Sequence, residues 1–209
     1  LLTQTPQAFR FKELYEIAKN HKNKVTDEAT LFINKDFKIK FIPGEKANNK
    51  ITYIDDIKTP KTFYGIGFDI HKLVKNKKLY LGGLKIPFHS GLEGHSDGDV
   101  ILHAIIDSIL GAVRKKDIGT YFPNTKKFKN IRSTKLLCEV VNKLEKINLR
   151  VSSIDLNIIL QSPNLKNYKE KIRSNISRLC RVNKKFVNVK AKTADKIGII
   201  GKNKALACE

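Results

Sequence analysis

The stretch from Gly91 to Gly111, GLEGHSDGDVILHAIIDSILG, constrains the fold of this chain more than any other. Its first half is polar and rich in glycine, whereas its second half is apolar with helical spacing. We expect a helix from about Asp99 to Arg114, with Asp97 or Ser96 as its N-cap. A loop that ends at a helix N-terminus presents backbone N–H groups, and these attract phosphate.

Three side chains form a candidate metal site. Asp69 and His71 are two residues apart in a predicted strand, so both point to the same side. His103, inside the predicted helix, adds a third N/O ligand, and three such ligands with a fourth position open are typical of catalytic zinc. Asp99 and Asp107 are each four residues from His103, so either could accept its second imidazole N–H. The alternative for each histidine is a hydrogen-bonded packing role.

Two further polar segments are candidates for phosphate chemistry. His95 and Ser96 directly precede the predicted helix and could hold a phosphate, the alternative being a capping segment without a ligand. Thr193 and Asp195 follow a predicted strand, where a hydroxyl and a carboxylate could ligate magnesium and a phosphate oxygen. The alternative there is a polar turn.

Strands alternate with helices along residues 63–209, which predicts an α/β (α+β) fold: a single mixed β-sheet with helices packed on one face. The expected strands are 62–73, 151–162, 186–193 and 204–209, with 78–88 as a hairpin partner bent at Gly82 and Gly83. The other expected helices are 133–147, capped by Ser133, and 165–180. Pro and Asn in residues 117–132 exclude a long regular element there.

The net charge of +21 points to anionic partners, either nucleic acid or a phosphorylated small molecule. A basic nucleic-acid-binding module is the alternative function. It leaves the clustered acidic residues unexplained and lacks interleaved aromatic residues, so we expect no nucleic-acid partner. The 3 cysteines are scattered, which favours a reducing compartment and excludes a cysteine metal site. No apolar run approaches the length of a membrane span.

Residues 1–62 differ from the rest of the chain. They contain Lys/Asn clusters, a candidate helix over 8–20 and strand-like residues 30–42. We interpret them as an N-terminal extension and a candidate remnant of a targeting leader, although their acidic residues are atypical of one. Because the chain begins at Leu1, we expect a fragment or a processed form. This interpretation predicts a plastid-type organelle (apicoplast or chloroplast stroma), with a cytoplasmic location as the alternative.

The segments DIH, GHSDGDVILHAIIDSILGA, DIG, FPNT and VNVKAKTADKIG, in this order, resemble the 2-C-methyl-D-erythritol 2,4-cyclodiphosphate synthase family of the non-mevalonate isoprenoid pathway. The resemblance covers residues 63–209. It implies a homotrimer whose sheets face a central axis, with active sites at the subunit interfaces. It also implies conversion of a small-molecule diphosphocytidyl substrate, 4-diphosphocytidyl-2-C-methyl-D-erythritol 2-phosphate, into the cyclic diphosphate with release of CMP. The implied cofactors are one Zn2+ per subunit and Mg2+ or Mn2+.

The resemblance assigns roles position by position. Zinc ligands are implied at Asp69, His71 and His103, a magnesium ligand at Asp195, and transition-state stabilisers at His95 and Thr193. Residues 160–166 match the cytosine pocket. Substrate binding is implied for Asp69, Ile70, His71, His95, Ser96, Asp117, Ile118, Gly119, Phe122, Pro123, Asn124, Thr125, Lys126, Leu160, Gln161, Ser162, Pro163, Asn164, Leu165, Lys166, Lys192, Thr193, Ala194, Asp195, Ile199 and Lys202.

Several positions depart from the family pattern. Asp195 stands where the family usually has Glu, which shortens the reach to the metal. Lys202 replaces an Arg and loses a bidentate phosphate contact. Asn124 and Lys126 replace acids, and Asn164 replaces a Lys. The family's last strand would continue beyond residue 209, so we expect an incomplete trimer core.

Overall fold

The computed structural model describes residues 7–22, 28–33, 37, 40, 42–45, 48, 50 and 62–209. The chain forms two compact units, Leu1–Lys61 and Thr62–Glu209. Among the described residues, no helix is both long enough and apolar enough to cross a membrane.

The first unit contains two short helices, α1 (Phe11–Lys19) and α2 (Glu28–Ile33). They share a small apolar cluster in which Ile17, Leu31 and Phe32 are buried. The expected helix over 8–20 is confirmed. The expected strand over 30–42 is wrong at its start, because residues 30–33 belong to α2. Residues 34–36, 38, 39 and 41 of that stretch lie outside the described part of the chain.

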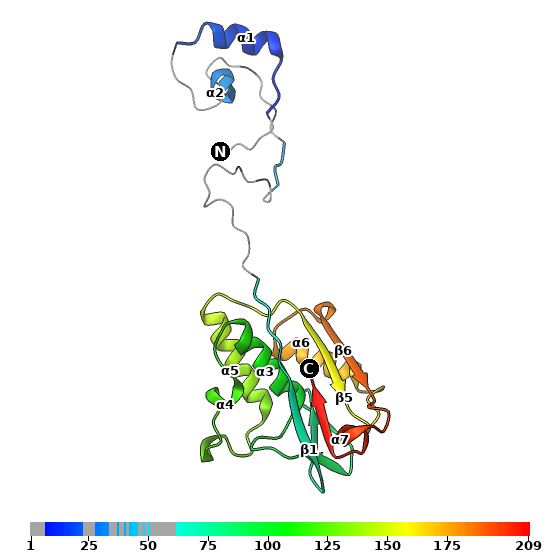
Figure 1. Ribbon diagram of the computed structural model, residues 1–209. Coiled ribbons are helices and arrows are strands. Elements are labelled where there is room, and N and C mark those ends of the chain that lie inside the picture. The colour runs from blue at the N-terminus through cyan, green and yellow to red at the C-terminus, as the bar shows by residue number, and fades with distance from the viewer. Residues whose placement is uncertain are drawn as a thin grey trace. The chain divides into compact units, whose positions relative to one another are not determined.

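The second unit is built on a five-stranded mixed sheet with the order β4-β1-β7-β5-β6 (Figure 1). Its strands are β1 (Asp69–Lys75), β4 (Ser90–Leu92), β5 (Ile154–Ile159), β6 (Val187–Lys192) and β7 (Ala205–Cys208). Strands β5 and β6 run parallel, while β1 pairs antiparallel with β4 and β7, and β5 pairs antiparallel with β7. The expected mixed α/β fold is therefore confirmed.

The hairpin prediction for residues 78–88 is wrong in its partner. Strands β2 (Leu79–Leu81) and β3 (Leu84–Ile86) pair with each other in a separate two-stranded sheet, and β1 pairs with β4 and β7 instead. Gly82 and Gly83 form the turn with φ of +60° and +81°. Two consecutive positive φ values are typical of a tight two-residue hairpin, so the glycines close this hairpin rather than bulge a longer strand.

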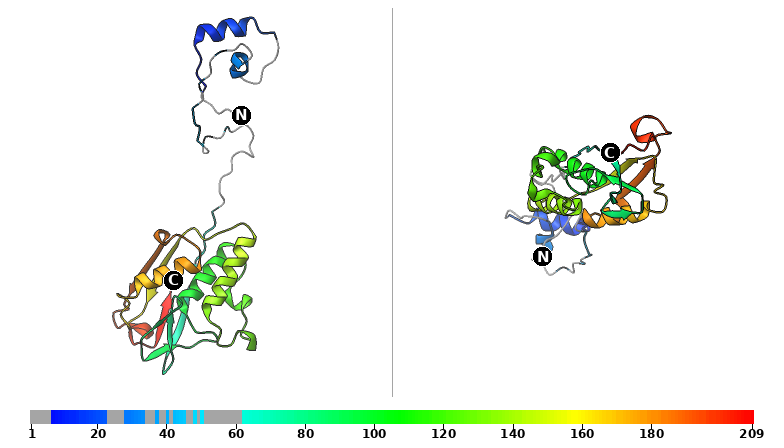
Figure 2. Two further views of the ribbon diagram at one scale, coloured as in Figure 1. Left: turned by 180° about the vertical axis from the view of Figure 1, so that it is seen from behind. Right: turned by 90° about the horizontal axis from the view of Figure 1, so that it is seen from below.

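Helices α3 (Val100–Ala112), α5 (Ser133–Lys146) and α6 (Lys169–Leu179) complete the core. Helix α3 packs against β1, β7 and α5, and α6 packs against β6 (Figures 1 and 2). This is why α3 is apolar around most of its circumference: it is covered by the sheet on one side and by a helix on another. The loop after α3 holds only α4 (Ile118–Tyr121) and a 3-10 turn, η2 (Lys126–Phe128). A second 3-10 turn, η3 (Lys184–Phe186), precedes β6, and α7 (Gly198–Gly201) precedes β7.

Both predicted helix caps are corrected. Asp99, not Asp97 or Ser96, caps α3, and its carboxylate accepts from the backbone N–H groups of Ile101 and Leu102. The same carboxylate, which is fully buried, also accepts from the N–H groups of the Gly82–Gly83 turn at 2.9 and 2.6 Å. Ser133 does not cap α5. Its hydroxyl is directed toward side chains of the candidate site instead.

Residues 62–68 were expected to extend the first strand but lie before β1 without forming strand structure. Gly65 and Gly67 run against α3. A Cβ atom at Gly67 would lie 1.9 Å from the carbonyl oxygen of Ala104, and one at Gly65 would lie 1.9 Å from that of Ser108. This close approach of two backbones requires glycine. It leads the chain directly into Asp69 at the start of β1.

Candidate metal centre and substrate pocket

Asp69 and His71 of β1 converge with His103 of α3, as predicted. Oδ2 of Asp69 lies 2.9 Å from Nε2 of His71 and 2.9 Å from Nδ1 of His103. The two imidazole nitrogens are 3.2 Å apart. The three groups could hold a metal ion, since their ligand atoms all lie within 4.8 Å of one another. The strand period places Asp69 and His71 on one side, and the packing of α3 on β1 delivers His103 to them.

The hydrogen-bond partners of His71 test whether this donor set suits a cation. Its Nδ1 is 2.5 Å from the carbonyl oxygen of Glu93, which can only accept, so Nδ1 carries the proton. Nε2 of the neutral ring therefore presents a lone pair toward the Asp69 carboxylate. Two acceptors at 2.9 Å repel each other unless a cation or a proton lies between them. Two imidazoles and one carboxylate are the ligand types that zinc prefers, so the residues fit a divalent metal.

The electrostatics of the triad follow from the same contacts. Burial alone would raise the pKa of Asp69, but hydrogen bonds from His103 and His71 lower it to about 2. Burial alone would lower the pKa of His71, but the hydrogen bond and the charge of Asp69 raise it above its usual 6.5. In the absence of metal the carboxylate therefore remains ionised and favours a proton on His71.

The predicted outer partner of His103 is wrong. Asp99 is committed to four backbone N–H groups, and Asp107 accepts from the N–H of Ile118 at 2.7 Å. Burial raises the pKa of Asp107. Nε2 of His103 lies instead 2.9 Å from Oγ of Ser133. Sequence reasoning missed this residue, because a serine at the start of a helix predicts a cap and nothing more.

The predicted phosphate segment is adjacent to the triad. Oγ of Ser96 lies 3.0 Å from Nε2 of His103 and accepts from the N–H of Gly98. Nε2 of His95 lies 2.7 Å from the carbonyl oxygen of Thr125 in the segment 122–126. A carbonyl oxygen can only accept, so Nε2 is the donor of this bond. This contact joins two stretches that the resemblance assigns to substrate.

The remaining predicted residues of the 117–126 loop differ in accessibility. Asp117 caps α4, and the hydrogen bonds that it accepts from Thr120 lower its pKa. Phe122 is only 6% exposed and its ring packs against Phe128, so its side chain is closed to a ligand. Pro123, Asn124 and Lys126 are exposed.

The predicted cytosine segment and the end of β6 line one pocket of about 180 Å³. Lys169 and Ala191 also line it, and sequence reasoning assigned no role to either. The lining residues are Leu160, Gln161, Pro163, Asn164, Leu165, Lys166, Lys169, Ala191, Lys192 and Thr193. Oγ1 of Thr193 donates to Oδ1 of Asp195 at 3.0 Å, so the predicted hydroxyl and carboxylate do lie together. Among the described residues, no hydrogen bond or ion pair joins Asp195 to the triad.

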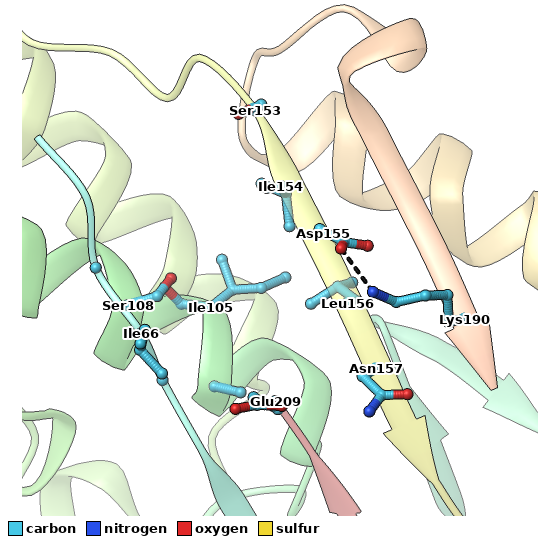
Figure 3. A pocket seen from close by; sticks show the side chains of 13 residues that line it. Ile66, Ile105, Ser108, Ser153, Ile154, Asp155, Leu156, Asn157, Lys190 and Glu209 are labelled. Atoms are coloured by element: carbon cyan, nitrogen blue, oxygen red, sulfur yellow. Dashed lines mark hydrogen bonds and ion pairs between the residues drawn. The ribbon is translucent and has the colours of Figure 1, made fainter. Parts of the chain in front are cut away.

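A pocket of about 300 Å³ lies elsewhere, between residues 65–67 and β5, with Ile105 and Ser108 of α3 at its side (Figure 3). Its polar groups include Glu209, Asn157 and the ion pair of Asp155 with Lys190 at 2.6 Å. None of the predicted site residues lines it. The residues predicted to bind metal or substrate therefore lie outside this pocket.

The chain matches known protein families along its whole length. Residues 62–209 match the YgbB family, and residues 1–64 match 2-C-methyl-D-erythritol 4-phosphate cytidylyltransferase. The chain is 51% identical over 210 residues to a bifunctional enzyme IspD/IspF of Pelagibacter ubique (strain HTCC1062), covering 100% of this chain and 57% of that protein. A solved structure of bifunctional IspDF from Campylobacter jejuni matches with TM-score 0.66 and 37% identity, covering 99% of this chain and 58% of that one. IspF of Plasmodium falciparum, solved as a CDP complex, matches with TM-score 0.61 and 39% identity over 70% of this chain and 90% of that chain.

Two earlier interpretations change with these findings. The chain spans about three fifths of the length of its bifunctional relatives. The segment interpreted as a leader remnant matches a cytidylyltransferase family instead. The expected plastid-type location is wrong, because the curated relatives come from bacteria such as Pelagibacter, Aliarcobacter, Wolbachia and Campylobacter, which favours the cytoplasmic alternative.

Proposed function

The chain belongs to the YgbB family, and we propose that residues 62–209 convert 4-diphosphocytidyl-2-C-methyl-D-erythritol 2-phosphate into 2-C-methyl-D-erythritol 2,4-cyclodiphosphate, with release of CMP. The observation that carries this proposal is the convergence of Asp69, His71 and His103 on one point beside the His95–Ser96 segment. The chemistry requires two phosphates to approach each other, and a cation site at a phosphate-binding loop answers that requirement.

We assign the triad to Zn2+ and Asp195 to Mg2+ or Mn2+. Bound ions of this kind polarise phosphoryl oxygens and neutralise their charge. The residues of the chain bind and orient the substrate. Nε2 of His95 donates to the carbonyl oxygen of Thr125, so Nδ1 of the protonated imidazole is left to donate to a phosphate oxygen. Ser96 offers a hydroxyl within reach of the same group. Thr193 stabilises charge that develops on the transferring phosphoryl group.

The pocket beside β6 is proposed to take the cytosine ring. Backbone groups of residues 160–166 recognise the base, since a base offers donors and acceptors that backbone N–H and C=O groups complement. This places little weight on the side chain of Asn164, where the family usually has a Lys. The ring would then lie beside Lys192 and Thr193, which line the same pocket.

A homotrimer with active sites at the subunit interfaces is part of the proposal. Tyr64, Ile66, Phe68 and Ile70 are exposed by 88%, 82%, 55% and 41% and alternate along one side of the chain. An exposed apolar strip of this kind supports burial against another subunit.

We further propose that residues 1–64 serve a cytidylyltransferase part like the one named in the bifunctional relatives. A cytidylyltransferase attaches a cytidine phosphate group, and a cyclase that releases CMP removes one, so both act on molecules that carry this group. One polypeptide would thus carry both reactions.

The test is release of CMP from the diphosphocytidyl substrate by the full chain, with and without a metal chelator. We expect release that a chelator abolishes and that zinc plus magnesium restores. His71→Ala should abolish release, whereas His89→Ala, an exposed histidine outside the site, should leave it unchanged. Salt-sensitive binding of random oligonucleotides without any release of CMP would favour the nucleic-acid alternative.

A further inference from the structure

We propose that Ser133, Asp97 and Arg132 form a positioning relay, which fixes the tautomer of His103 so that its Nδ1 lone pair points at the metal site. The inference rests on the metal site of the proposed function. None of the three residues was assigned a role in the site by its sequence pattern. All three lie on the side of His103 that faces away from Asp69.

The contacts form an unbroken series. Nε of Arg132 lies 2.7 Å from Oδ2 of Asp97 as an ion pair. Oδ1 of Asp97 lies 2.5 Å from Oγ of Ser133 and also accepts from the Ser133 N–H at 3.1 Å. Oγ of Ser133 in turn lies 2.9 Å from Nε2 of His103. Ser133 is fully buried, and the Asp97 side chain is only 5% exposed, so water does not substitute for these partners.

The number of protons fixes the direction of each bond. A serine hydroxyl has one proton, and the carboxylate of Asp97, paired with a guanidinium, accepts only. The proton of Ser133 therefore goes to Asp97, and the serine oxygen is left as an acceptor toward His103. Oγ of Ser96 lies 3.0 Å from the same Nε2 and 3.3 Å from Oγ of Ser133, so the Ser96 proton can go to the Ser133 oxygen and leave Ser96 as a second acceptor. Nε2 of His103 then carries a proton, which in the neutral ring leaves Nδ1 as the lone-pair nitrogen. Nδ1 is the atom 2.9 Å from Oδ2 of Asp69, on the side of the metal site.

Arg132 anchors the relay to the hairpin. Its guanidinium lies 3.8 Å from the centre of the Tyr80 ring and donates to the carbonyl oxygen of Gly83 at 2.9 Å. The Gly82–Gly83 turn is itself held by Asp99, the cap of α3. The helix that carries His103 and the relay that orients it are thus fixed to the same turn. Loss of the relay should affect the imidazole without releasing the helix.

Two readouts test the relay in the full chain. The first is nitrogen NMR of the histidine rings in metal-free protein, which distinguishes a proton on Nε2 from one on Nδ1. The second is the dissociation constant for Zn2+, by competition with a chelator, together with the absorption spectrum of bound Co2+. We expect a proton on Nε2 of His103 in the wild type, whether or not Nδ1 also shares a proton with Asp69. Ser133→Ala should weaken Zn2+ binding by about 10- to 100-fold and populate the Nδ1–H form.

Matched variants separate positioning from stability. Ser133→Thr retains the hydroxyl and should restore Zn2+ affinity and the Co2+ spectrum. Ser108→Ala removes a hydroxyl from α3 that bonds only within its helix, so it should match the wild type in both readouts. Asp97→Asn offers amide N–H groups to Ser133, so the serine proton is free to turn toward His103. That variant should therefore favour Nδ1–H and weaken Zn2+ binding.

The outcomes distinguish the relay from the proposed function. Wild-type affinity and wild-type tautomer in both Ser133→Ala and Asp97→Asn would overturn the relay. A wild type whose His103 carries no proton on Nε2 in the metal-free protein would also overturn it, and this readout needs no folded variant. A wild type that has the Nε2–H tautomer but binds neither Zn2+ nor Co2+ would support the hydrogen-bond series while removing the proposed metal function.

Discussion

Substitution of Asp99 by Asn tests how far one buried carboxylate organises the second unit. Asp99 accepts four backbone N–H groups: two at the start of α3 at 3.2 Å, and those of Gly82 and Gly83 at 2.9 and 2.6 Å. An amide keeps one oxygen for three of these donors. Its NH2 group must then face the N–H of Gly83 or turn away, and in either case the shortest of the four bonds is lost.

The magnitude follows from the bonds. A hydrogen bond to a charged group contributes about 1.5–3 kcal/mol, and a buried donor left without a partner costs about 1–3 kcal/mol. Burial raises the pKa of Asp99 because desolvation penalises its charged form, and a neutral amide recovers part of that cost. We therefore expect a loss of about 3 kcal/mol, near the lower end of the combined range. For a unit of this size each kcal/mol lowers the Tm by about 2–4 °C, which gives a decrease of about 6–12 °C.

The assay is thermal unfolding of the full chain, followed by circular dichroism without metal. Asp155→Asn is the matched control, because Asp155 is an exposed carboxylate on β5 that pairs with Lys190 and Asn188. Exposed pairs contribute about 0–1 kcal/mol, so its Tm should change by at most a few degrees. A Tm within about 2 °C of wild type for Asp99→Asn, or an equal loss in both variants, would refute the reasoning.

Three further predictions concern the metal, the strand entry and the subunit interface. Burial lowers the pKa of His71, but Asp69 raises it above 6.5 overall, so protons compete with the metal for His71 once the pH falls below this raised pKa. Isothermal titration should show Zn2+ affinity falling by about tenfold per pH unit in that range. An affinity independent of pH would contradict this. Gly67→Ala would place a methyl group 1.9 Å from the Ala104 carbonyl oxygen, and denaturant unfolding should show a loss of about 2 kcal/mol or more. Gly111→Ala, whose Cβ would meet nothing closer than 3.9 Å, should be neutral or stabilising, and equal losses in the two variants would count against the close approach. Ile66→Asp adds a charge to the exposed apolar strip and should shift the mass measured by light scattering from trimer to monomer, whereas a trimer of unchanged stability would exclude the strip from the interface.

The sequence was sufficient to predict that Asp69, His71 and His103 lie together, because their placement follows from local periodicity. Asp69 and His71 share a side of any strand, and His103 is internal to a helix that had to pack on that strand. The position of the His95–Ser96 segment beside the triad was predicted in the same way, from a glycine-rich loop before a helix. The mixed sheet followed from the alternation of strands and helices.

The polar partners of these residues were not predictable, because they depend on contacts between distant segments. Asp99 was predicted as a hydrogen-bond partner of His103, yet its carboxylate accepts from the N–H groups of the Gly82–Gly83 turn instead. Ser133 had a cap pattern, but Asp97 and His103 flank its hydroxyl only after α5 has packed on α3. The hairpin was assigned to the wrong strand for the same reason: residues 78–88 indicate two strands and a turn, but not which neighbour completes the sheet.

The central position of β7 has a consequence for the order of folding. This strand lies between β1 and β5, and its register places Cys208 opposite Asp69 and Leu206 opposite His71. The paired residues are separated by about 140 positions, and contacts between such distant residues form slowly. Asp69 and His71, two of the proposed metal ligands, therefore lie in a strand whose pairing with β7 can form only after the residues between them have been synthesised. We expect metal-binding competence to develop late in folding, in step with the native contacts of β7 rather than with the formation of α3.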